Sequence, residues 1–98
     1  MYVMAIIVKW DGEKYLIADI DRGDKVLLVD LDTNSKKVLE KPTRIDDMED
    51  FLEKHNPAVL VCKSISRELR LAIEEIGVKV ISNVGGNVND FLKEILWR

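Results

Sequence analysis

The sequence predicts an α/β domain in which helices cover both faces of a mixed five-stranded sheet. Three observations support this fold class. Apolar runs separated by turn residues fill the first third of the chain, amphipathic segments with apolar residues three and four apart follow, and short apolar runs alternate with those segments. The expected order is β-β-β-α-β-α-β-α in a single three-layer domain over residues 1–98, because 98 residues suffice for one core.

The first part of the chain predicts three antiparallel strands. Residues 2–9 are rich in valine and isoleucine and too short for a convincing helix. The runs KYLIADID and KVLLVDLD flank Arg22-Gly23, which is the pattern of a β-hairpin. The polar segment 33–43 predicts at most a short edge strand around Val38. We therefore expect the first three strands to form a meander.

The second part of the chain alternates helices with buried strands. Helices are expected over residues 45–55, 65–76 and 87–96, and strands over residues 58–62 and 78–82. Pro57 stops the first helix, Ser64 or Ser66 can cap the second, and Gly77 suits its left-handed end. Helical crossovers of this kind make the strands that they join parallel, so the first, fourth and fifth strands should run in one direction.

Composition and charge exclude several classes of protein. A net charge of −3 and a pI near 5.1 argue against general nucleic-acid binding, which needs a basic face. No apolar run approaches the roughly 20 residues that span a bilayer. The start of the chain shows no export signal, and the single cysteine cannot form an internal disulfide, so we expect a reducing, cytoplasmic location.

The sequence resembles the dinitrogenase iron-molybdenum cofactor biosynthesis family, small proteins with a ribonuclease H-like fold. The similarity is carried by residues 56–96, NPAVLVCKSISRELRLAIEEIGVKVISNVGGNVNDFLKEIL, and is weaker over residues 14–32. The matching motifs are Gly77-Val78-Lys79-Val80, Gly85-Gly86 and the helix Val88 to Leu96. The resemblance implies a non-enzymatic metallocluster carrier or accessory protein of iron-sulfur or iron-molybdenum cofactor assembly, with cluster donor or recipient proteins as partners.

Several residues with potential binding chemistry should meet at one edge of the sheet. Parallel strands end at the same edge, where α/β proteins commonly bind ligands. The residues expected there are Trp10, Asp11, Cys62, Lys63, Ser64, Ser82, Asn83, Gly85 and Gly86. Beside Lys63 and a helix N-terminus, the Cys62 thiol should have a lowered pKa and could ligate a cluster, with further ligands from a second subunit or an exogenous thiol.

Each candidate residue also has a purely structural interpretation. Gly85 and Gly86 could bind an anion at a helix N-terminus, but a sharp strand-to-helix turn needs glycine anyway, and no G-x-G-x-x-G motif surrounds them. Cys62 could equally be a small buried hydrophobe. His55 suits the C-terminal end of a helix without any metal. Trp97 could anchor a homodimer or pack within its own helix.

Enzymatic chemistry finds little support in the sequence. Two-metal cleavage of nucleic acid needs converging carboxylates, and the first strand has none before Asp11. The single histidine should lie at the opposite end of the βα units from the rim serines, which disfavours a Ser-His-Asp arrangement. Two hypotheses remain. One is a carrier with Cys62 as the metal ligand. The other is a small-anion-binding or protein-interaction module that has lost cluster binding, motivated by the loops KWDGEKY and CKSIS, which differ from the family pattern.

Overall fold

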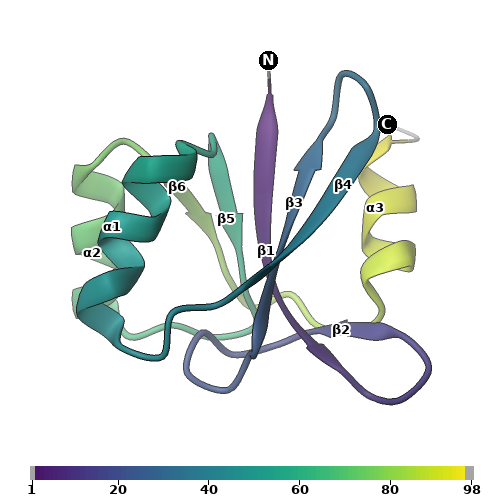
Figure 1. The fold of residues 1–98 in the computed structure, drawn as a ribbon, viewed down its shortest axis with the longest axis horizontal. Helices are drawn as coiled ribbons and strands as arrows, with labels where there is room; N and C mark the ends of the chain where they lie inside the picture. The colour runs from purple at the N-terminus through teal and green to yellow at the C-terminus, as the bar shows by residue number, and fades with distance from the viewer. Residues whose placement is uncertain (1, 97–98) are drawn as a thin grey trace.

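Strand β1, Val3–Trp10, lies at the centre of the sheet and is buried from Met4 to Val8. The computed structural model describes residues 2–96, and within them six strands and three helices form one α/β domain (Figure 1). The sheet order is β4-β3-β1-β5-β6, with β2 paired to the end of β1. The run of apolar residues in β1 follows from this central position, because both of its faces are covered.

The other strands are β2 (Tyr15–Ile17), β3 (Lys25–Asp30), β4 (Ser35–Glu40), β5 (Val59–Val61) and β6 (Lys79–Ile81). The helices are α1 (Ile45–His55), α2 (Arg67–Glu75) and α3 (Val88–Leu96). Strands β1, β5 and β6 are parallel, whereas β2 and β3 are antiparallel to β1 and β4 is antiparallel to β3. The predicted mixed sheet and the shared direction of the first strand and the two later ones are confirmed.

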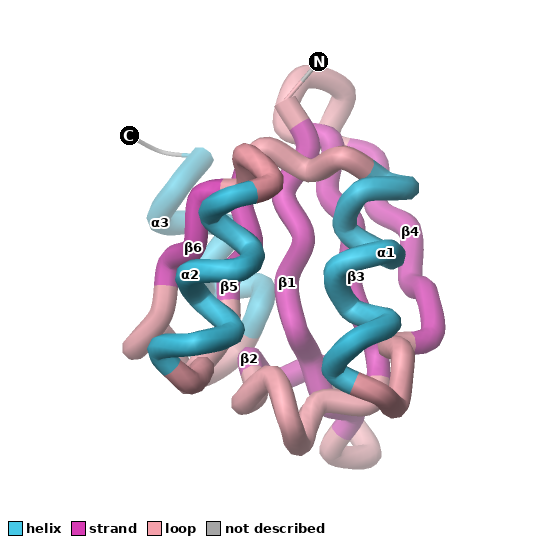
Figure 2. Tube along the Cα trace, turned by 90° about the vertical axis from the view of Figure 1, so that its left-hand side faces the viewer, coloured by secondary structure: helices cyan, strands magenta, loops and turns pink. Residues whose placement is uncertain are grey.

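The helices form two layers on opposite faces of the sheet, as predicted. Helices α1 and α2 lie side by side on one face and α3 lies on the other (Figures 1 and 2). Alternation along β1 divides the core accordingly. Ala5 and Ile7 pack with the α1 and α2 residues Met48, Leu52, Leu69 and Ile73. Met4, Ile6 and Val8 pack with Val88 and Leu92 of α3.

The predicted meander is wrong in its pairing. Strand β2 pairs with β1, through Trp10 opposite Tyr15, as a meander requires. It does not pair with β3, which instead pairs with β1 over its whole length. The hairpin partner of β3 is β4, so segment 33–43 supplies a six-residue edge strand, longer than the short one predicted, and the sheet has six strands instead of the predicted five. A polar sequence can form this strand because β4 lies at the edge of the sheet, where its side chains remain largely exposed to solvent.

The glycine of the expected Arg22-Gly23 hairpin turn serves a different purpose. Gly23 is buried, and its N–H donates to the carbonyl oxygen of Asp19 at 2.9 Å. A Cβ atom at this position would collide with Cγ2 of Ile7 and lie 3.2 Å from the carbonyl oxygen of Val8. The turn is therefore packed directly against β1, and glycine is needed there for close approach.

Local signals at the helix ends agree with the structure. Ser66 caps α2 by accepting a hydrogen bond from the Leu69 N–H at 3.2 Å, and Gly77 after its end has a φ of +91°. Helix α1 ends before Pro57 as expected, with Asn56 in the left-handed conformation. Trp97 lies outside the described residues. No helix in the described part of the chain is long and apolar enough to cross a membrane.

Candidate functional site

The edge at which β1, β5 and β6 end does not form an open crevice. The segment 15–20, which contains β2, crosses this edge and hydrogen-bonds to the loops that follow the strands. The Ile17 N–H donates to the carbonyl oxygen of Gly86 at 2.9 Å, and the Lys63 N–H donates to that of Ala18 at 2.9 Å. Backbone from the first part of the chain thus occupies the place where the sequence predicted a ligand site.

Cys62 does not face this edge. Its side chain is fully buried in the core between the sheet and helices α1 and α2, and its N–H donates to the carbonyl oxygen of Ile81 at 3.1 Å. Burial raises the pKa of the Cys62 thiol to about 11, which outweighs the opposite effect of Arg70. The expected low-pKa thiolate on the rim is therefore wrong, and metal binding by Cys62 would require the core to open.

Lys63 and Ser64 lie at the surface but form a second, separate environment. The Ser64 hydroxyl donates to Asp19 Oδ1 at 2.5 Å, which ties the loop before α2 to the connection between β2 and β3. Lys63 lines a recess of about 220 Å³ together with Lys9 and Arg22. Asp19 also faces this recess, and its carboxylate lies 3.9 Å from the Arg22 guanidinium. Part of the positive charge of the recess is therefore balanced. This basic recess is the remnant of the predicted rim site.

Asn83, Gly85 and Gly86 form a third environment on the turn between β6 and α3. Asn83 and Gly86 have positive φ values of 63° and 91°, so both shape the turn. A recess of about 350 Å³ beside Gly85 and Gly86 is also lined by Asp90 and Glu94, whose carboxylates disfavour an anion. The geometry supports the corner-turning interpretation for Gly86, whereas Gly85 has no positive φ, so its position does not need a glycine.

This interpretation predicts different effects at the two glycines. Replacing Gly86 with alanine should lower the free energy of unfolding by about 1 to 2 kcal/mol, because a φ of +91° strains a residue with a Cβ atom. Gly85→Ala is the matched control and should change it by less than about 0.5 kcal/mol, since its φ is not in that region and an added Cβ meets no atom within 4 Å. Urea denaturation measures both, and equal effects would contradict the assignment.

A further recess, lined mostly by apolar surface, lies on the α3 side of the sheet, and we call it the α3 groove. It has a volume of about 260 Å³ and is lined by Trp10, Glu13, Lys14, Tyr15, Leu27, Lys36, Val38, Asn87, Val88 and Asn89. These residues come from the β1–β2 hairpin, strand β3, the edge strand β4, and the start of α3. Trp10 is 48% exposed and Val38 is 43% exposed, so the groove displays large apolar side chains to solvent.

The walls of the α3 groove are held in place by local hydrogen bonds. The Trp10 and Tyr15 rings meet edge to face with their centroids 4.8 Å apart. In the turn that connects these two residues, the Asp11 carboxylate accepts hydrogen bonds from the N–H groups of Lys14 at 2.8 Å and Glu13 at 2.9 Å, and these bonds lower the pKa of Asp11. The hairpin that carries Trp10 is therefore braced from within.

The charge of the α3 groove is mixed but favours an anion. Lys14 and Lys36 bring two ammonium groups, against one carboxylate from Glu13. Asn87 precedes α3, and its side chain accepts the Asn89 N–H at 2.8 Å, so the positive end of the helix dipole lies at this wall, with Asp90 in the first turn balancing part of it. A groove with aromatic walls and cationic corners can bind a small anionic group that also has apolar surface.

Among the predicted site residues only Trp10 lines the α3 groove, and Asp11 lies in the same hairpin. The others are separated: Cys62 is in the core, Lys63 and Ser64 lie at or beside the basic recess, Ser82 binds Arg70, and Asn83, Gly85 and Gly86 form the β6–α3 turn. Sequence reasoning missed Lys14, Tyr15, Lys36 and Val38. Their signal was present in part, since Trp10 and Tyr15 flank a turn motif and Lys36 and Val38 alternate along β4.

Within residues 2–96, no group of three or more His, Cys, Asp or Glu side chains could hold a metal ion. His55 lies at the end of α1 with its ring against Phe51, centroids 4.6 Å apart, and burial lowers its pKa. Among the described side chains, therefore, no group could bind a metal together with His55.

Comparison with known proteins supports the fold. No family model matches the sequence, and no curated protein matches it. The solved structure of PH0822 is similar with a TM-score of 0.85 and 22% identity, covering 97% of this chain and 90% of that one. The apo form of the orange protein from Desulfovibrio gigas has a TM-score of 0.81 and 18% identity, covering 98% and 88%. TM1290, a NifB-related protein from Thermotoga in the DUF35 family, has a TM-score of 0.77 and 18% identity, covering 97% and 87%.

Proposed function

We propose that this protein is a non-enzymatic accessory protein of metal-cofactor assembly that holds an anionic cofactor precursor in the α3 groove. The observation that carries the proposal is the gathering of Trp10, Lys14 and Lys36 around the start of α3. The sequence resemblance to cofactor biosynthesis proteins supports it, as does the structural likeness to the orange protein and to a NifB-related protein.

Non-covalent contacts would hold the precursor. An iron-sulfur or iron-molybdenum precursor rich in sulfide has negative charge and a polarisable surface. The ammonium groups of Lys14 and Lys36 and the start of α3 would balance that charge, and the Trp10 and Tyr15 rings would cover the sulfides. Such binding suits a carrier, because a precursor without a protein thiolate bond can pass from a donor protein to a recipient in the cytoplasm.

The test is anaerobic reconstitution with iron and sulfide, with and without molybdate, followed by desalting and metal analysis. We expect bound metal and a visible chromophore in the wild type and in Cys62→Ala. The double variant Lys14→Ala/Lys36→Ala should retain roughly tenfold less metal, because it loses two charge-assisted contacts. The matched control is Lys54→Ala/Lys79→Ala, which removes the same charge from exposed sites outside the groove.

Localisation to the groove has its own readout. In a Trp97→Phe background, Trp10 is the remaining tryptophan, so bound precursor should quench its fluorescence. If the chromophore is lost in Cys62→Ala and retained in Lys14→Ala/Lys36→Ala, the proposed site in the α3 groove is wrong and ligation by the Cys62 thiolate is favoured. A wild type that binds no metal but is stabilised by inorganic phosphate would favour the small-anion module instead.

A further inference from the structure

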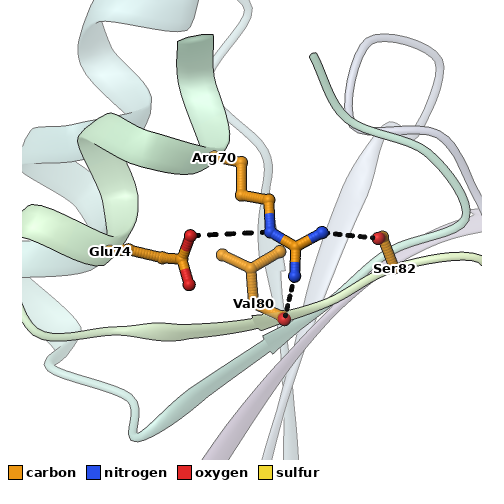
Figure 3. Close-up of polar contacts among 4 residues, drawn as sticks. All are labelled: Arg70, Glu74, Val80 and Ser82. Atoms are coloured by element: carbon orange, nitrogen blue, oxygen red, sulfur yellow. Dashed lines mark hydrogen bonds and ion pairs between the residues drawn. The ribbon is translucent and has the colours of Figure 1, made fainter. Parts of the chain in front are cut away.

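The two edges of the sheet are protected to very different degrees. Strand β6 has only three residues, and Arg70 of α2 reaches across it (Figure 3). The Arg70 guanidinium donates to the carbonyl oxygen of Val80 at 3.5 Å and to the Ser82 hydroxyl at 3.3 Å, and its Nε lies 3.5 Å from a Glu74 carboxylate oxygen. A side chain that binds an edge carbonyl blocks further strand pairing there.

Strand β4, at the other edge, has no such cover among the described residues. It is six residues long and exposed except for the half-buried Leu39. The Lys41 N–H donates to the carbonyl oxygen of Asp24 at 3.2 Å, so odd-numbered residues direct their backbone groups toward β3. The N–H and C=O groups of Lys36, Val38 and Glu40 therefore point away from the sheet, where another strand can bind them.

We propose that β4 pairs antiparallel with β4 of a second copy of this chain, with Val38 on the two-fold axis. In this register Val38 lies opposite Val38 of the partner subunit, and Lys36 lies opposite Glu40 of the partner subunit. Two-fold symmetry makes the Lys36–Glu40 pair occur twice, whereas the Val38 pair on the axis occurs once. The result is one continuous sheet through both subunits. The interface uses Lys36 and Val38, which also line the α3 groove, but pairing of the two strands does not require bound cargo.

Charge complementarity selects both the occupant and the register. An axis at Lys36 or at Glu40 would set like charges directly opposite each other, and an axis at Lys37 would do the same for that lysine. An axis at Leu39 would place Lys37 opposite Lys41 of the partner subunit. The axis at Val38 alone pairs lysine with glutamate, so the lysines that would repel other strands become specific for this one.

The intrachain contacts of Glu40 fit the same arrangement. The Lys25 ammonium forms an ion pair with the Glu40 carboxylate from the neighbouring strand, on the same face as Lys36. The hydrogen bond to Glu40 raises the pKa of Lys25. In the dimer, Glu40 would lie between Lys25 of its own chain and Lys36 of the partner subunit, so positive and negative charges alternate across the joined sheets. The low net charge of −3 adds little repulsion between copies.

Sedimentation equilibrium with charge-swapped variants tests the proposal. The wild type should dimerise with concentration, and Lys36→Glu or Glu40→Lys alone should raise the dissociation constant roughly tenfold, because each places like charges opposite each other twice. The double variant Lys36→Glu/Glu40→Lys should recover most of the wild-type affinity, because lysine and glutamate again lie opposite each other between subunits, while the Lys25–Glu40 ion pair within each chain is lost. Lys37→Glu is the matched control, because Lys37 faces Leu39 of the partner subunit, and it should change the constant by less than about threefold.

Disulfide trapping tests the register separately. Cys62 is buried, so it should not interfere with oxidation of introduced cysteines. Val38→Cys should cross-link readily, since residues opposite each other in an antiparallel pair have Cα atoms about 5.5 Å apart. Lys36→Cys and Glu40→Cys should cross-link poorly. A wild type that stays monomeric at roughly 1 mM, or equal cross-linking at the three positions, would overturn the proposal.

Discussion

Replacement of Leu60 by alanine should lower the free energy of unfolding by about 2 to 5 kcal/mol. Leu60 is fully buried in β5, between two parallel neighbours and beneath α1 and α2. Truncation removes apolar contacts and leaves a cavity that the surrounding strands cannot fill, because the neighbouring backbones are fixed by their hydrogen bonds. Urea denaturation monitored by circular dichroism measures the loss.

Leu71→Ala is the matched control for this prediction. Leu71 belongs to α2 but is 52% exposed, so the same truncation there removes little buried area. Alanine also favours a helix slightly more than leucine does, and the expected change is within about 0.5 kcal/mol. A similar loss in both variants would mean that the described division between core and surface is wrong.

The second large effect concerns the pH dependence that Cys62 imposes. The pKa of its thiol is about 11 in the folded protein against 9.0 for an ordinary cysteine. Below the lower value the thiol is protonated in both states, so it contributes no pH dependence. Between the two values the unfolded chain releases the proton while the folded chain keeps it, so a rise in pH favours unfolding. Stability should therefore fall across this interval, by about 2 to 3 kcal/mol in total.

The comparison with Cys62→Ala isolates this contribution from the lysines and tyrosines that also titrate at high pH. The difference between the two proteins in free energy of unfolding should be constant up to about pH 9 and then shift against the wild type. Alkylation gives an independent measurement: iodoacetamide should modify Cys62 only when the chain unfolds, because the buried thiol is neither ionised nor accessible. Labelling of the native protein at the rate of a free thiol would contradict both the burial and the raised pKa.

The burial of Cys62 and the raised pKa of its thiol bear directly on the proposed function. A thiol that stays protonated and enclosed cannot bind and release a metal cluster without partial unfolding, whereas the α3 groove is open and already carries cationic and aromatic groups. The two functional hypotheses raised by the sequence thus separate by location. Cluster binding through Cys62 predicts a site in the core, and non-covalent binding predicts a site beside Trp10.

The sequence by itself determined the elements that depend on local chemistry. The Ser66 cap, the left-handed residues at Gly77 and Gly86 and the stop before Pro57 all follow from the backbone preferences of single residues. The apolar runs of the parallel strands also predicted helices on both faces, because only a doubly covered sheet buries every residue of such a run.

Only the tertiary structure decided which strands pair and which way the strand-end residues face. Strand β2 does not form the predicted hairpin with β3, because segment 15–20 hydrogen-bonds to the loops after β5 and β6. These contacts join residues far apart in the sequence, so local patterns do not predict them. The same segment closes the predicted crevice. A side chain's face depends on its position within a strand, and one residue reverses it. For this reason the Cys62 side chain lies in the core, whereas Trp10 lines the α3 groove together with Lys36 and Val38. These two residues belong to β4, for which the sequence predicted at most a short strand.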